Sequence, residues 1–192
     1  MGYFTDYGLN AMLNGSGFAG TATYAGLLVA AAAKTGTATA STDVISSTSH
    51  GYSNGDVVIF TTLTGGSGLT LNRPYYVVNQ ATSTFQVAKS AGGTVVDITS
   101  DYSTINVKKL TEVSGGSPAY ARKGLTWTTA AAGTIGISST YAFDVPAGTV
   151  DAVGFYNASS SGTLLAGHVG TQEVFGAQGT YTLTSAPMTL TS

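Results

Sequence analysis

The chain has 192 residues, a net charge of −2 and a charged fraction of only 8%, whereas soluble proteins average about 25%. So little positive charge cannot neutralise a phosphate backbone, which argues against nucleic-acid binding. The hydrophobic fraction of 43% supplies a core and excludes wholesale disorder. The absence of cysteine excludes disulfides, a thiolate metal site and a cysteine nucleophile.

Helical spacing is confined to the start of the chain. Apolar side chains recur near every third or fourth position between Thr5 and Leu13, until the glycine-rich segment Asn14–Gly17 ends the pattern. We therefore expect one short N-terminal helix. The apolar run Ala22–Ala33 that follows is too short for a membrane span, which needs about 20 residues, so it predicts a buried strand.

The rest of the chain alternates short β-runs with glycine-rich turns, a pattern typical of an antiparallel sandwich or barrel. The predicted strands are Thr21–Ala30, Asp56–Leu63, Tyr75–Asn79, Thr84–Ala88, Thr94–Ile98, Ile105–Leu110, Ala121–Thr128, Gly133–Ser138, Tyr141–Val145, Asp151–Tyr156, Thr163–His168, Thr180–Thr184 and Met188–Thr191. The fold class is thus all-β.

A shift in composition divides the chain into a host domain and an insertion. Residues 42–109 predict a small β-barrel-like module, and residues 1–41 and 110–192 predict an antiparallel β-sandwich or jelly-roll-like host domain that it interrupts. Lys34–Ala40 and Glu112–Ser117 have the composition of linkers on either side. An exposed loop tolerates such an insertion because loop-closure entropy grows slowly with length.

Four segments of the outer parts occur in a characteristic order: Tyr24–Leu28, Glu112–Arg122, Tyr141–Gly148 and Val153–Leu165. This order resembles that of accessory structural proteins of tailed-bacteriophage virions, a family often described as tail-fibre-like. The resemblance covers the two outer parts and implies a structural role without enzymatic activity. The middle module departs from the family pattern, although its opening at residues 50–56 is similar to small β-modules inserted in other phage structural proteins.

The aspartates and histidines are the candidates for catalysis and metal binding. The pairs Asp144/Asp151 and Asp97/Asp101 could supply general acid–base chemistry, but aspartate more often ends strands or closes turns. The only histidines, His50 and His168, lie in different modules, and a metal site needs three or four ligands. We expect no catalytic, cofactor-binding or metal-binding residue and no cofactor.

Two further motifs have alternative interpretations. Gly65–Gly68 lacks the Lys-Ser/Thr that follows the glycines of a phosphate loop, so it predicts a hairpin tip. Tyr52, Tyr75 and Tyr76 could form a surface that stacks on a sugar, because tyrosine combines an apolar face with a polar tip. Packing of these rings in the core is the interpretation we favour, and the three remain candidate ligand contacts.

Three functional hypotheses follow. The first is an accessory protein that decorates the capsid exterior and docks on the major capsid protein as a homotrimer, because low charge and small side chains suit broad contacts between identical subunits. The second is a minor tail or tail-fibre-associated protein that binds tail proteins of the same virion. The third is an adhesin that binds a host-surface glycan. All three place the protein in a virion assembled in the bacterial cytoplasm, with neither nucleic acid nor a membrane as partner.

Overall fold

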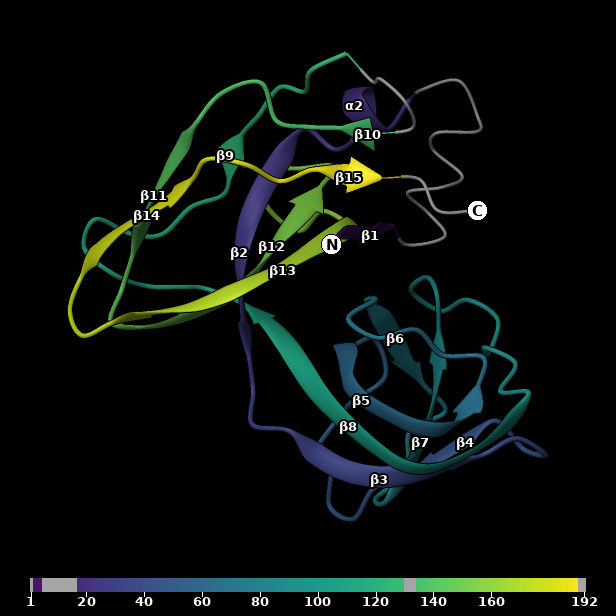
Figure 1. Ribbon diagram of the computed structural model, residues 1–192. Coiled ribbons are helices and arrows are strands. Elements are labelled where there is room, and N and C mark those ends of the chain that lie inside the picture. Colours follow the sequence, from purple (N-terminus) through teal and green to yellow (C-terminus); the bar gives the residue numbers. More distant parts are fainter. Residues whose placement is uncertain (1, 5–16, 130–133, 190–192) are drawn as a thin grey trace. The chain divides into compact units, whose positions relative to one another are not determined.

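The computed structural model describes residues 2–4, 17–129 and 134–189 (Figure 1). Nearly all its regular structure is β, and the one described helix is α2 (Phe18–Thr21). The all-β prediction is therefore confirmed, while the helix predicted between Thr5 and Leu13 lies outside the described residues. The chain forms two compact units: residues 1–29 with 112–192, here called the host unit, and residues 30–111, the barrel unit.

The barrel unit is a closed barrel of six antiparallel strands. Its strands, in the order of their pairing, are β3 (Lys34–Thr39), β4 (Val44–Ser46), β7 (Thr84–Ala88), β6 (Tyr75–Val78), β5 (Val57–Ser67) and β8 (Ser100–Glu112). The ring closes because β8 pairs with both β5 and β3. Figure 1 shows these strands curling around a common centre. Closure leaves no unpaired edge in the ring.

Side chains from all six strands fill the barrel. The largest fully buried ones are Phe60, Tyr75, Phe85, Ile45, Ile98 and Ile105. The two long strands, β5 and β8, keep pairing from Val57 opposite Leu110 to Ser67 opposite Ser100, with two register shifts on the way. Such irregularities bend a strand, which a small closed barrel requires.

Three predictions on the barrel unit were wrong. Lys34–Thr39, expected as a linker, is strand β3, although only Ala38 in it is buried. Backbone hydrogen bonds to its neighbours hold such a strand in a barrel. It therefore needs no alternating apolar pattern, and its polar composition gives no sign of a strand. Thr94–Ile98, expected as a strand, contributes only an isolated bridge between Val95 and Ala88.

The third error concerns Gly65–Gly68, expected as a hairpin tip. Its first three residues lie within β5, where Gly65 pairs with Tyr102. A Cβ on Gly66 would lie 2.5 Å from the ring of Tyr102, and Gly66 has a φ of 41°. The glycine therefore makes room for an aromatic ring on the neighbouring strand.

The host unit is built around an open antiparallel sheet. Its strands, in the order of their pairing, are β1 (Gly2–Phe4), β13 (Leu164–Phe175), β12 (Gly148–Tyr156), β2 (Tyr24–Ala30) and β9 (Lys123–Gly124). Two separate ladders join β11 (Tyr141–Val145) to β14 (Gly179–Leu183) and β10 (Thr134–Ile135) to β15 (Met188–Thr189). Their buried side chains share one core, which includes Leu27, Phe143, Phe155, Leu165 and Met188.

The only tryptophan, Trp127, packs against this host core. Its ring centroid lies 5.0 Å from that of Phe18 and 4.9 Å from that of Phe155. The indole Nε1 donates a hydrogen bond of 2.6 Å to the carbonyl of Ala22. Trp127 was expected on a strand from Ala121 to Thr128, but the regular strand there is only β9, and Trp127 makes an isolated bridge with Ile137.

The chain enters and leaves the barrel unit at adjacent positions. Within the barrel unit, the amide of Ala31 donates a hydrogen bond of 2.9 Å to the carbonyl of Lys109. Within the host unit, the amide of Val113 donates one of 3.0 Å to the carbonyl of Leu27. The barrel is therefore an insertion between two neighbouring segments, and the units divide after residues 29 and 111.

Candidate functional site

The three tyrosines proposed as ligand contacts are buried in the barrel unit. Tyr75 is fully buried, and Tyr52 and Tyr76 are each 5% exposed. The hydroxyl of Tyr52 donates to the carbonyl of Val107 at 3.2 Å, and that of Tyr75 accepts from the amide of Thr70 at 3.0 Å. Rings in this position cannot stack on a ligand from solution. Their burial agrees with the packing interpretation that the sequence favoured, and not with the surface contact that was its alternative. Burial raises the pKa of Tyr52 and of Tyr76 to about 12.

His50 serves the barrel unit as a structural side chain. It is 4% exposed, and its Nε2 donates to the carbonyl of Ala81 at 2.9 Å. Because that carbonyl can only accept, the other ring nitrogen is free to accept, and Nδ1 takes the amide proton of Tyr52 at 3.0 Å. The ring also packs against those of Tyr52 and Phe85. Both nitrogens are therefore engaged by the protein itself.

Two of the four aspartates considered for catalysis, Asp151 and Asp101, are also bound by their surroundings. Asp151 accepts hydrogen bonds from Gln172 Nε2 at 2.7 Å and from Thr149 Oγ1 at 3.3 Å, where the register between β12 and β13 shifts. Asp101 accepts from the amide of Ala40 at 2.7 Å. These contacts fix local backbone geometry. Across residues 2–4, 17–129 and 134–189, no three His, Asp or Glu side chains come together as metal ligands.

A cluster around Arg122 in the host unit was not found from the sequence. The side chain of Arg122 is 8% exposed and binds Glu112 through two nitrogens, at 2.8 Å and 2.7 Å. It also donates to the carbonyl of Ala158 at 2.8 Å, and its guanidinium lies 3.5 Å from the centre of the Tyr156 ring. The hydroxyl of Tyr120 donates to Glu112 at 3.2 Å and accepts from the amide of Leu27 at 2.7 Å.

Every polar group of the Arg122 cluster contacts another protein group. The cluster therefore stabilises the chain where the chain returns from the barrel unit to the host unit. Burial raises the pKa of the Tyr120 hydroxyl, and the neighbouring Glu112 carboxylate raises it further. The sequence signal was faint: Glu112 opens a segment with the composition of a linker, and Arg122 follows ten residues later in a predicted strand. In the barrel unit, Lys109 likewise binds an acidic side chain of the same unit, Asp56, at 2.8 Å.

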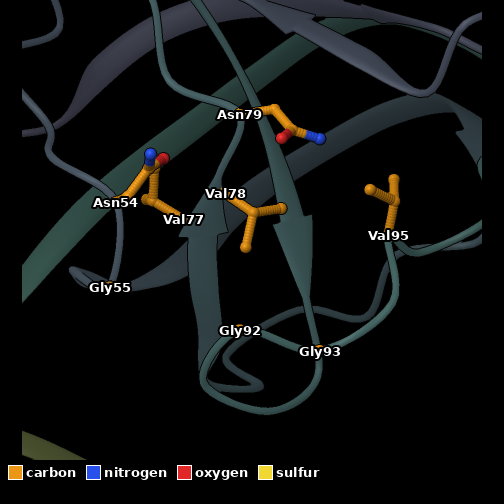
Figure 2. A pocket seen from close by; sticks show the side chains of 8 residues that line it. All are labelled: Asn54, Gly55, Val77, Val78, Asn79, Gly92, Gly93 and Val95. Carbon is orange, nitrogen blue, oxygen red and sulfur yellow. The ribbon is translucent and has the colours of Figure 1, made fainter.

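A shallow pocket on the described part of the barrel unit is a candidate binding site. It has a volume of about 320 Å³ and is lined by Asn54, Gly55, Val77, Val78, Asn79, Gly92, Gly93 and Val95. Figure 2 shows these residues from close by. Asn54 and Gly55 precede β5, Asn79 follows β6, and Gly92 and Gly93 come from the turn after β7. The size is at the lower end of small-molecule pockets, which span about 300–1,000 Å³.

The lining of this pocket combines an apolar floor with a neutral polar rim. Val77 is buried, and Val78 and Val95 are half-buried, whereas Asn54 and Asn79 are exposed. None of the lining residues is charged, and none is a nucleophile or a general acid or base. The arrangement can therefore bind a neutral polar molecule, and it provides no group for a chemical step.

No protein-family model, curated protein or solved structure matches this chain. Among the described helices, none has the length and apolar character needed to cross a bilayer.

Proposed function

We propose that this chain is a non-enzymatic structural protein of a tailed-phage virion, and that it is an accessory protein on the exterior of the capsid. The host unit would dock on the major capsid protein, and the barrel unit would be carried as an inserted module. The observation that carries the proposal is the construction of the chain: two units with separate cores, joined where β2 ends and where β8 ends.

The separate cores support a division of tasks, in which the host unit docks on the capsid and the barrel unit is displayed. The barrel is closed by β5 and β8, and its hydrogen bond from Ala31 to Lys109 joins its own ends. The host unit secures its side of the junction with Arg122 and Glu112. A module held in this way can change without altering the core of its carrier, as loop insertions generally can.

The proposal includes a β-sandwich of jelly-roll type for the host unit. The ladder of β11 and β14 and the sheet containing β12 and β13 contribute to one core. The chain passes from β11 to β12 and from β13 to β14 through short connections, as strands do when they alternate between two facing sheets. An experimental structure that instead showed β11 and β14 continuing the main sheet would contradict this assignment.

We place the contacts between copies on the outer half of β13. Residues Gly170–Val174 are exposed, Val174 is 70% exposed, and β1 pairs only with residues 166–168 of this strand. The described part of the chain thus leaves one side of this segment without a neighbouring strand, which is a ready template for another chain. A homotrimer joined here would have one such segment from each copy.

Light scattering of the purified protein tests the assembly. Val174→Lys should shift a trimer toward monomer, because it introduces a charge into the proposed contact. The matched control is Leu71→Lys, which changes the other large apolar side chain that is exposed among the described residues, 41% exposed and located in the barrel unit. A wild-type monomer at micromolar concentration would refute the trimer, and equal effects of the two substitutions would refute its location.

Immunogold labelling of intact phage particles tests the location. Label spread over the head supports capsid decoration. Label confined to the tail supports the alternative, a minor tail or tail-fibre-associated protein, and refutes decoration. Failure to find the chain in purified particles by mass spectrometry would refute a virion role altogether.

A further inference from the structure

The two asparagines of the barrel pocket have carboxamides whose orientations are set by the protein. Asn54 Oδ1 accepts the amide proton of Gln80 at 2.9 Å, which places its Nδ2 on the other side. Asn79 Nδ2 donates to Gln86 Oε1 at 2.6 Å. Gln86 Nε2 in turn donates to the carbonyl of Thr42 at 2.8 Å, so Gln86 must present its oxygen to Asn79.

Each carboxamide therefore has one polar group that is available to a ligand. Asn54 Nδ2 is a donor and Asn79 Oδ1 is an acceptor, and neither has a hydrogen-bond partner among the described residues. A donor and an acceptor at one pocket match a hydroxyl-bearing molecule, because a hydroxyl group both donates and accepts. The half-buried Val78 and Val95 offer apolar surface to carbon-bound hydrogens.

The backbone around the pocket keeps its rim open. Gly55 and Gly92 have φ values of 91° and 64°, and a Cβ at either position would meet nothing within 4 Å. Asn79 has a φ of 49°, a conformation that asparagine adopts more readily than most residues. Side chains other than glycine would be strained at the first two positions and would project from the rim.

From this geometry we propose that the pocket binds one neutral sugar residue of a glycan, with Asn54 donating to one hydroxyl and Asn79 accepting from another. The absence of charge in the lining favours a neutral sugar over an acidic sugar or a phosphate. The volume suits a single ring rather than an extended peptide. This site differs from the tyrosine surface considered from the sequence, and it does not depend on where the protein sits in a virion.

Saturation-transfer NMR on the full chain tests the proposal. The probes are glucose, galactose and N-acetylglucosamine, with N-acetylneuraminic acid and trialanine as charged and peptide comparisons. We expect signals from at least one neutral sugar at about 10 mM, because a shallow site with few hydrogen bonds supports roughly millimolar affinity. No signal from any neutral sugar, or a stronger one from the acidic sugar or the peptide, would overturn the proposal.

Two substitutions separate the pocket from other surfaces. Asn54→Asp keeps the acceptor for Gln80 but replaces the donor, and Asn79→Gly removes the acceptor while suiting the positive φ. Each should weaken binding about tenfold, the usual effect of one lost hydrogen bond. Asn72→Gly is the matched control, because Asn72 also has a positive φ, 58°, in the barrel unit and does not line the pocket.

Amide hydrogen exchange verifies that each variant keeps the barrel folded. If the barrel of the Asn54→Asp variant lost its protection from hydrogen exchange, the test of sugar binding would rest on Asn79→Gly alone. Unchanged binding in a folded Asn79→Gly protein would overturn the proposal, as would an equal loss in the Asn72→Gly control.

Discussion

The barrel unit and the host unit are stabilised in different ways. In the barrel the backbone ladder runs around a closed ring, because β8 pairs with β5 as well as β3. In the host the main sheet is open and ends in the short strands β1 and β9. The host adds side-chain links that cross between segments, above all Arg122 to Glu112 and Trp127 to Ala22. In a closed ring each strand has a hydrogen-bonded neighbour on both sides. An open sheet leaves backbone groups unpaired at its edge strands, where another chain can bind, and it relies more on specific side-chain links.

The largest expected effect comes from removing the buried cation of the host unit. Arg122→Met should destabilise that unit by about 3–5 kcal/mol, because Glu112 would lose its charged partner and Ala158 its donor. Trp127 fluorescence during urea unfolding measures the host unit, since the chain has no other tryptophan. Lys123→Met, which also removes a positive charge, is the control and should cost much less. An equal loss of hydrogen-exchange protection in the barrel would show that the units are not independent.

The next effect is confined to the barrel. Gly66→Ala should destabilise it by about 2–4 kcal/mol, because the new Cβ meets the Tyr102 ring and the φ of 41° is strained for alanine. Gly51→Ala isolates the strain, since Gly51 has a φ of 73° but open space around its Cβ. Hydrogen exchange in β5 and β8 measures both variants. Equal effects of the two substitutions would mean that the clash contributes nothing.

His50→Ala should cost the barrel about 2–3 kcal/mol. It leaves the amide of Tyr52 and the carbonyl of Ala81 without the imidazole that now binds them. Urea unfolding followed by circular dichroism and hydrogen exchange measures the loss. His168→Ala is the comparison in the host unit, because His168 Nδ1 has no hydrogen-bond partner to lose among the described residues. A larger loss from His168→Ala would contradict the structural role of His50.

The smallest expected effect is a dependence on alkaline pH. The pKa of Tyr76 is about 12 in the folded barrel and about 10 in an unfolded chain, so the folded state holds the proton more tightly. This contribution to stability is complete below pH 10 and is lost as pH rises toward 12, by at most about 1.4 kcal/mol per pH unit. Tyr76→Phe should flatten the fall in barrel stability between pH 10 and 11, measured by urea unfolding. A wild-type barrel equally stable at pH 8 and 11 would contradict the shift.

Local patterns predicted some elements closely. Thr84–Ala88 and Tyr141–Val145 were predicted with the bounds that the structure shows. The turn before β5 also follows from its residues. The amide of Ser53 donates to the carboxylate of Asp56, the amide of Asp56 donates to the carbonyl of Ser53, and Gly55 supplies a φ of 91°. These features depend on neighbouring residues, which a sequence displays directly.

Local patterns did not predict the features that depend on residues far apart in the sequence. Strand β3 is polar and exposed for most of its length, and it is a strand because β4 and β8 pair with its two sides. The candidate pocket joins Asn54, Asn79 and Gly92 from three turns, and no spacing in the sequence brings them together.

The amino-acid sequence by itself determined that this protein is almost entirely β, with a charge-poor surface and a core rich in aromatic rings. Tertiary structure alone decided that the barrel closes, which side chains fill its core, and that Arg122 meets Glu112. The reason is physical: alternation and turn residues act over a few positions, whereas ring closure and burial depend on strands far apart in the chain.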